Sequence, residues 1–134
     1  MKGQYLTVEW VIFFGIGVTL IIATYMAFSG ISTTVRDSAL TSQLDRSGEL
    51  VRGSVANVFL AASESGSQIT YELPIPSKAS GCAYQILVDS AKMLNVNCTD
   101  NLKQGVVLSL YGINTNSLNT IYSTRGYVKI SSNG

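Results

Sequence analysis

The chain has 134 residues, enough for one small folded unit and one appended element. Charged residues make up 13%, about half the usual share of roughly 25%, and a net charge of +1 gives no sign of nucleic-acid binding. The chain has no histidine, which removes the commonest general base and metal ligand. Because zinc-type spacings, a P-loop and a nucleophile elbow are also missing from the sequence, we predict a protein that is not an enzyme and uses no cofactor or metal.

The first element in chain order is an apolar segment. Residues 10–35 carry no charge, and residues 10–28 come close to the ~20 residues that an α-helix needs to cross a bilayer. The run is longer than the apolar part of an ordinary secretory signal, and no small-residue cleavage site follows it. We predict a transmembrane or filament-core helix over residues 4–34. Its main apolar residues are Trp10, Phe13, Phe14, Ile16, Val18, Leu20, Ile21, Ile22, Met26 and Phe28.

Glu9 places a carboxylate at the entry to this segment. A charge at hydrocarbon depth costs a few kcal/mol unless it lies near the interface or is paired. Glu9 therefore marks the interfacial end of a membrane helix, or it pairs with a cation from another chain. A free α-amino group made by proteolysis would be such a cation.

The helical pattern continues beyond the apolar run. Residues 32–62 contain no proline, and their apolar residues recur at steps of four, seven, four, three and four, which keep one face. These residues are Leu40, Leu44, Val51, Val55, Val58 and Ala62. We predict one helix over residues 5–62, roughly 85 Å long, apolar all round in its first half and amphipathic in its second. The remaining residues are too few to bury it, so the first half needs another partner.

After residues 63–68 the apolar period changes from near four to two, which predicts strands. The first strand lies over residues 69–75, and Pro74 and Pro76 predict that it is an edge strand or that they mark a strand end. Further strands are expected in "AYQILVD", "KMLNVNC", "GVVLSLYGI" and "TRGYVKISS", with a polar loop over residues 114–120. Together they predict an antiparallel sheet of four or five strands, with one face packed on the amphipathic half-helix.

The second and third strands read as a hairpin about residues 89–91. Pairing residues whose numbers sum to 180 sets Ile86 opposite Leu94, Tyr84 opposite Val96, and Cys82 opposite Cys98. We predict a disulfide between these cysteines rather than two buried free thiols. Its closed loop of near fifteen residues would contribute about 3 kcal/mol. Such a bridge in a small domain favours an oxidising, extracytoplasmic location.

Asn97, Cys98 and Thr99 form an N-glycosylation sequon, so Asn97 is a candidate glycosylation site. The alternative, which we favour, is an ordinary asparagine at a strand end. The predicted fold class is α+β: a long hydrophobic and amphipathic N-terminal α-helix, then a small antiparallel β-sheet head domain, like a lollipop. The expected parts are a leader over residues 1–3, the helix over 4–34 and a head over 35–134. The head combines a half-helix over 35–62 with a β-domain over 68–134.

The N-terminus resembles a type IV pilin precursor, in particular the archaeal kind with a class III signal peptide. The matching elements are a short basic leader ending in Lys2 and Gly3, then Gln4, Glu9 and the apolar segment. The layout of a long helix and a small β-rich head is also similar to that of the family. The strands "ITYELPIP" and "SLYGI" show a weak similarity to strands of archaeal pilins. The resemblance implies cleavage by a prepilin peptidase between Gly3 and Gln4. It also implies that Glu9 guides docking by approaching a neighbour's new amino terminus, although Glu9 then stands sixth in the mature chain, where the family usually has it fifth.

The resemblance further implies that the chain is a major pilin. Many copies of it would form the helical filament of an archaeal type IV-like pilus, which serves surface adhesion. Such a subunit is inserted in the cell membrane before an assembly ATPase and a membrane platform protein incorporate it into the extracellular filament. Three alternatives remain open. They are a minor pilin or pseudopilin of a secretion or DNA-uptake system, an archaellin, and a monomeric single-pass membrane protein with an extracellular binding domain.

Overall fold

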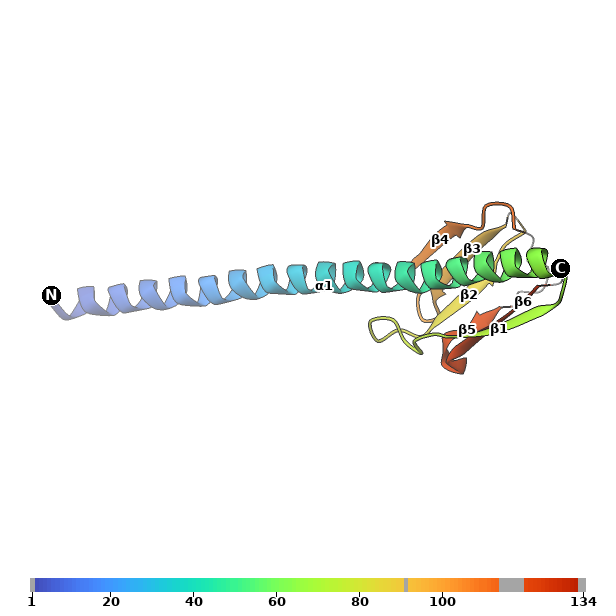
Figure 1. Ribbon diagram of the computed structural model, residues 1–134. Helices are drawn as coiled ribbons and strands as arrows, with labels where there is room; N and C mark the ends of the chain where they lie inside the picture. The colour runs from blue at the N-terminus through green and yellow to red at the C-terminus, as the bar shows by residue number, and fades with distance from the viewer. Residues whose placement is uncertain (1, 91, 114–119, 133–134) are drawn as a thin grey trace. The chain divides into compact units, whose positions relative to one another are not determined.

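A computed structural model describes residues 2–90, 92–113 and 120–132 of the chain. One long helix, α1 (Lys2–Ser65), is followed by an antiparallel β domain, which confirms the predicted α+β fold class (Figure 1). The helix begins three residues earlier and ends three residues later than predicted. It ends where Gly66 adopts φ +62° and donates its N–H to the carbonyl of Ala62 at 2.9 Å, a left-handed cap that suits glycine. The chain divides into two compact units, Met1–Asp37 and Ser38–Gly134.

The strands form two antiparallel sheets rather than the single sheet of four or five strands that we predicted. A four-stranded sheet has the order β4-β3-β2-β5, and a separate ribbon pairs β1 with β6. The described strands are β1 (Ile69–Pro74), β2 (Tyr84–Val88), β3 (Met93–Cys98), β4 (Gly105–Ser109), β5 (Ile121–Tyr122) and β6 (Tyr127–Ser132).

The single-sheet prediction was wrong because of the segment between the last two strands. β5 is too short to show an alternating pattern, and a 3-10 turn (Ser123–Arg125) with Gly126 at φ +75° redirects the chain before β6. β6 therefore pairs with β1 in a two-stranded ribbon. β1 is an edge strand of this ribbon, which agrees with the prediction from Pro74. Of the predicted polar loop, residues 114–119 lie outside the described residues.

The hairpin register is also shifted by two residues from our prediction. Ile86 lies opposite Val96 and Tyr84 opposite Cys98, so paired numbers sum to 182 rather than 180. The turn is centred one residue later than expected because Lys92 takes a left-handed conformation, φ +60°, and donates its N–H to the carbonyl of Asp89 at 2.9 Å. A shift of two residues keeps every side chain on its predicted face, since the period of a strand is two.

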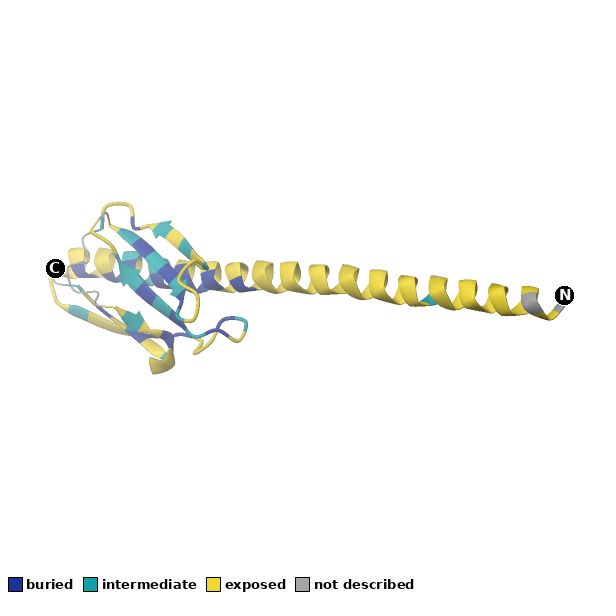
Figure 2. Cartoon of the chain, turned by 180° about the vertical axis from the view of Figure 1, so that it is seen from behind, coloured by how far each residue is buried: buried dark blue, intermediate teal, exposed yellow. Residues whose placement is uncertain are grey.

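Within the second unit, the C-terminal part of α1 lies across one face of the four-stranded sheet. It passes in front of β2 and β3 in Figure 1, and Figure 2 shows the same layers from behind. All six apolar helix positions that we predicted for this face are buried: Leu40, Leu44, Val51, Val55, Val58 and Ala62. All of them except Ala62 belong to a single core with the inward residues of both sheets, as the amphipathic pattern indicated.

The seven-residue step in that pattern, between Leu44 and Val51, is filled by two small buried residues, Ser47 and Gly48. A Cβ atom on Gly48 would lie 2.5 Å from Cδ1 of Leu108. A larger residue at position 48 would therefore fit only if the Leu108 side chain on β4 moved.

Candidate functional site

The first unit presents an uncovered apolar surface. Residues 5–37 are exposed, apart from Gly17, which is partly buried. The ten residues predicted for the filament-core helix have exposed fractions between 38% for Val18 and 75% for Phe14. The helix is long and apolar enough to cross a membrane, and none of that stretch is buried. Since apolar surface in water costs roughly 25 cal/mol per Å², this segment needs a lipid or protein environment.

The threonine hydroxyls within this segment are hydrogen-bonded inside the helix. Three threonines each donate to the carbonyl four residues earlier: Thr19 to Gly15 at 2.8 Å, Thr24 to Leu20 at 2.7 Å, and Thr34 to Gly30 at 3.0 Å. A hydroxyl satisfied in this way can enter an apolar environment without an unpaired donor. These bonds were not predicted from the sequence, although the recurrent four-residue spacing from glycine to threonine signals two of the three.

Glu9 lies on one face of α1 with three apolar side chains. Together with Leu6, Trp10 and Phe13 it lines a shallow open depression on the helix surface. Within the described residues Glu9 has no hydrogen bond or ion pair. A carboxylate in this setting is stable in water, but it needs a cation or an interface once the surrounding side chains are covered.

The predicted disulfide joins Cys82 and Cys98 in the head. Their Cα atoms lie 6.1 Å apart and both residues are buried. Cys82 precedes β2 rather than facing Cys98 in the ladder, so the bridge ties the segment before β2 to the end of β3. The two sulfurs lie within 4.8 Å of a carboxylate oxygen of Asp100, but bonded sulfurs offer no thiolate to a metal.

A buried polar cluster also holds the segment that precedes β2. The hydroxyl of Tyr84, which is fully buried, donates to the carbonyl of Pro76 at 2.7 Å and also bonds Ser47 on α1. The hydroxyl of Ser123 donates to the carbonyl of Ser77 at 2.8 Å and accepts the backbone N–H of Tyr84 at 3.0 Å. Burial raises the pKa of the Tyr84 phenol, and the Ser47 bond opposes that rise. These contacts join helix, sheet and connecting segment to one another.

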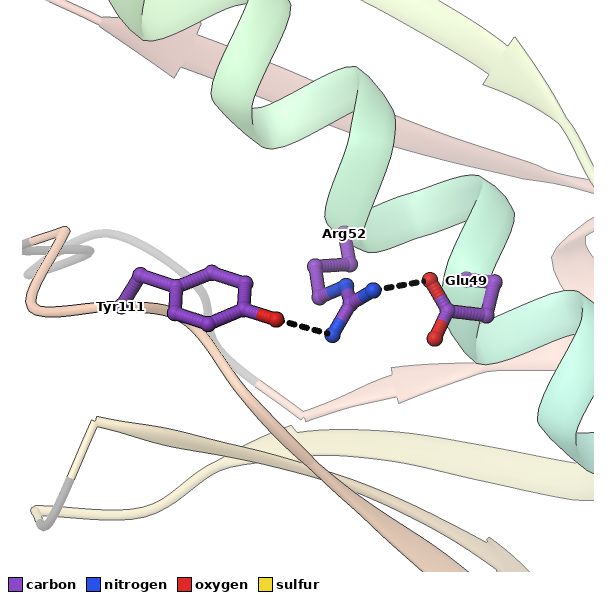
Figure 3. A network of polar contacts seen from close by, with 3 residues as sticks. All are labelled: Glu49, Arg52 and Tyr111. Carbon is purple, nitrogen blue, oxygen red and sulfur yellow. Dashed lines mark hydrogen bonds and ion pairs between the residues drawn. The ribbon is translucent and has the colours of Figure 1, made fainter.

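At the margin of the head, Arg52 links α1 to the turn after β4 (Figure 3). Its guanidinium forms an ion pair with Glu49 at 2.6 Å and donates to the Tyr111 hydroxyl at 3.3 Å. The guanidinium carbon lies 5.2 Å from the centroid of the Tyr111 ring, within cation–π range. Because Tyr111 is 77% exposed, this contact contributes little to stability, but it orients the ring.

The candidate glycosylation residue, Asn97, is partly buried on β3, a central strand of the sheet. The sequon hydroxyl on Thr99 donates to the carbonyl of Ala83 at 2.7 Å. Glycosylation at Asn97 stays a prediction. Gly3 and Gln4, the predicted cleavage site, lie in the first turns of α1, and their cleavage is likewise a prediction.

No protein-family model, curated protein or solved structure matches this chain. The functional interpretation therefore rests on the residues themselves. The predicted assembly residues share one uncovered apolar segment, while the cysteines and Asn97 belong to the separate head unit. The apolar helix indicates membrane insertion or a signal, and the disulfide indicates an extracellular location.

Proposed function

We propose that this chain is the major structural subunit of an archaeal type IV-like pilus. It polymerises through the apolar helix over residues 4–34 and presents the head on the filament surface, where it serves adhesion. In this proposal the protein has no enzymatic activity. It resides in the cell membrane before assembly and in an extracellular helical filament afterwards.

The observation that carries the proposal is the uncharged stretch over residues 10–35, whose large apolar side chains are exposed. Outside a bilayer, copies of the same helix can cover this surface. A repeated heterologous contact between identical subunits extends without limit and satisfies every subunit in the same way. The head, with its own core and its disulfide, remains folded outside such a bundle.

Glu9 has a specific role in this proposal. A prepilin peptidase cuts between Gly3 and Gln4, and the new amino group on Gln4 becomes the cation for Glu9 of a neighbouring subunit. The pair removes the cost of placing the carboxylate among apolar side chains. An assembly ATPase and a membrane platform protein drive the transfer of each subunit from bilayer to filament.

A second candidate is a monomeric single-pass membrane protein with an extracellular binding domain. The internally bonded threonines and the length of the apolar stretch favour it, because they suit a helix surrounded by lipid. In that case Glu9 lies at the membrane interface and needs no partner. A minor pilin, a pseudopilin or an archaellin would share the helix but differ in abundance or in the filament it builds.

Electron microscopy of filaments sheared from cells, with mass spectrometry of their main protein band, tests the proposal. We expect this chain to be the main component, with Gln4 as its first residue. An intact Met1 on protein found only in membranes, monomeric in detergent, would overturn the proposal and support the second candidate. Presence as a trace component would instead indicate a minor pilin.

A further inference from the structure

The four-stranded sheet has a second face, turned away from α1, that none of the described elements covers (Figure 2). The ladder registers place Tyr122, Gln85, Asn97 and Gly105 side by side in one row across all four strands. Directly opposed residues of antiparallel strands share a face, so these groups face outward together.

The adjacent row on the same face contains Leu87, Asn95 and Val107. Neither row contains a charged residue. The four side chains on the central strands, Gln85, Leu87, Asn95 and Asn97, are partly buried, whereas Val107 is 55% exposed and Tyr122 is 48% exposed. The surface is therefore uncharged, with the three amides and Leu87 at its centre, and Tyr122 and Val107 at its two margins.

The three amides on this face, those of Gln85, Asn95 and Asn97, form no side-chain hydrogen bond within the described residues. Each amide offers one carbonyl acceptor and two N–H donors. A Cβ atom on Gly105 would collide with the Asn97 side chain, so Asn97 lies across β4 where only a glycine leaves room. The amides are therefore held in place by the sheet while their hydrogen-bonding groups remain available.

We propose that this amide face binds a neutral saccharide. Sugar hydroxyls both donate and accept hydrogen bonds, which matches the dual character of a side-chain amide. The apolar C–H face of a pyranose ring can pack against the Tyr122 ring, which has an apolar body and a polar tip. An anionic or cationic ligand would find no counter-charge in either row.

The inference rests on the proposed adhesive function for its biological meaning, because it names the class of ligand that adhesion would use. Binding itself does not require a filament, since the whole amide face belongs to one head. The two proposals therefore fail separately.

The test is native affinity electrophoresis of the full chain, in a detergent without a sugar headgroup, through gels containing soluble mannan, dextran, laminarin or galactan. Heparin serves as the anionic counter-probe. We expect at least one neutral polysaccharide to retard the protein and heparin not to do so. The proposal is overturned if none of the four retards it, or if only heparin does.

Variants then locate the site. Tyr122→Ala should weaken the retardation about tenfold, a typical effect of truncating an aromatic residue that anchors a ligand. Tyr127→Ala is the matched control, because Tyr127 lies on β6 and is also 48% exposed. Val107→Lys adds bulk and charge at an exposed position of the amide face and should abolish retardation while leaving the core intact.

Circular dichroism melts confirm that each variant is folded. Equal effects of Tyr122→Ala and Tyr127→Ala, or wild-type retardation of Val107→Lys, would overturn the assignment to this face. Electron microscopy of the same variants separates the two proposals. Retained sugar binding by a protein that never forms filaments contradicts the proposed function alone, and normal filaments without sugar binding contradict this inference alone.

Discussion

Glu9 and Tyr84 are ionisable side chains in opposite situations. Glu9 lies exposed among Leu6, Trp10 and Phe13. Its carboxylate costs free energy only when another chain or a bilayer covers that surface and removes the charge from water. Tyr84 is buried within the head, where hydrogen bonds with Pro76 and Ser47 already satisfy its hydroxyl. Glu9 therefore affects assembly, and Tyr84 affects the stability of a single head.

Glu9→Ala is expected to leave the protein in the membrane but to reduce the yield of sheared filaments at least tenfold. Removing one member of a covered ion pair costs about 3–5 kcal/mol, because the partner amino group stays unpaired. Quantitative blotting of sheared and membrane fractions measures the change. Glu64→Ala, which removes an exposed carboxylate near the other end of the same helix, is the matched control. A normal filament yield from the Glu9 variant would contradict the pairing role.

Tyr84→Phe should lower the free energy of unfolding near neutral pH by about 1–2 kcal/mol, since the carbonyl of Pro76 loses its donor. Because burial raises the pKa of Tyr84 in the folded state, the stability from this group is full below the unfolded pKa of about 10. It is lost as the pH rises through the higher folded pKa. Urea unfolding at several pH values should show a steeper alkaline loss in the wild type than in the variant. An equal loss of unfolding free energy with pH in the wild type and the variant would show that the pKa of Tyr84 does not change on unfolding.

At the scale of elements, Gly48 lies where α1 packs against side chains of β3 and β4, and the disulfide ties the segment before β2 to the end of β3. Gly48 and Gly53 lie on the same helix but in different settings. The first faces Leu108 and Val96, while nothing lies within 4 Å of a Cβ built on the second. The disulfide adds a covalent tie to a segment that Tyr84 and Ser123 already hold by hydrogen bonds.

Gly48→Leu should lower the free energy of unfolding of the head by about 1–3 kcal/mol, because the added side chain forces α1 away from β3 and β4. Gly53→Ala should raise it by up to about 1 kcal/mol, since alanine is the better helix former and has free space there. Urea unfolding followed by circular dichroism measures both changes. Equal effects at the two positions would refute the close approach at Gly48.

Removing the disulfide with the double variant Cys82→Ala, Cys98→Ala should lower the free energy of unfolding by about 3 kcal/mol. The bridge closes a loop with a sequence separation of 16, which restricts the unfolded chain. Urea midpoints with and without reductant measure the effect. Reductant should shift the wild type to the variant's midpoint and leave the variant unchanged. An unshifted wild type would mean that the bridge is absent or resists reduction in the folded head.

At the scale of the whole molecule, the two compact units have different needs. The core residues, from Leu40 to Ile130, all belong to the second unit, which has its own hydrophobic core. The first unit has no buried residue among those described and depends on its surroundings. The chain thus joins a segment that requires partners or lipid to a head that does not.

A fragment of residues 38–134 is accordingly expected to be a soluble, folded monomer with an oxidised disulfide, whereas the full chain needs detergent or a filament. Analytical ultracentrifugation gives the oligomeric state, and thiol titration gives the redox state. Aggregation of the fragment would show that residues 1–37 contribute to folding of the head. A soluble, monomeric full chain without detergent would remove the reason for proposing a polymer.

The sequence by itself determined the long helix, the buried face of its second half, the hairpin and the cysteine pair. These follow from local periodicity and composition, which need no knowledge of distant contacts. The position of Glu9 at the entry to an uncharged segment was equally visible, because it depends only on the order of residues.

Only the tertiary structure decided the hairpin register, the division into two sheets, and the close approach at Gly48. Lys92 adopts a left-handed backbone that its residue type does not favour, and the short β5 carries no periodic signal. The row from Tyr122 through Gln85 and Asn97 to Gly105 arises from pairings between strands far apart in the chain. The residues of this row show no local sequence pattern, because only the pairing of the four strands brings them side by side.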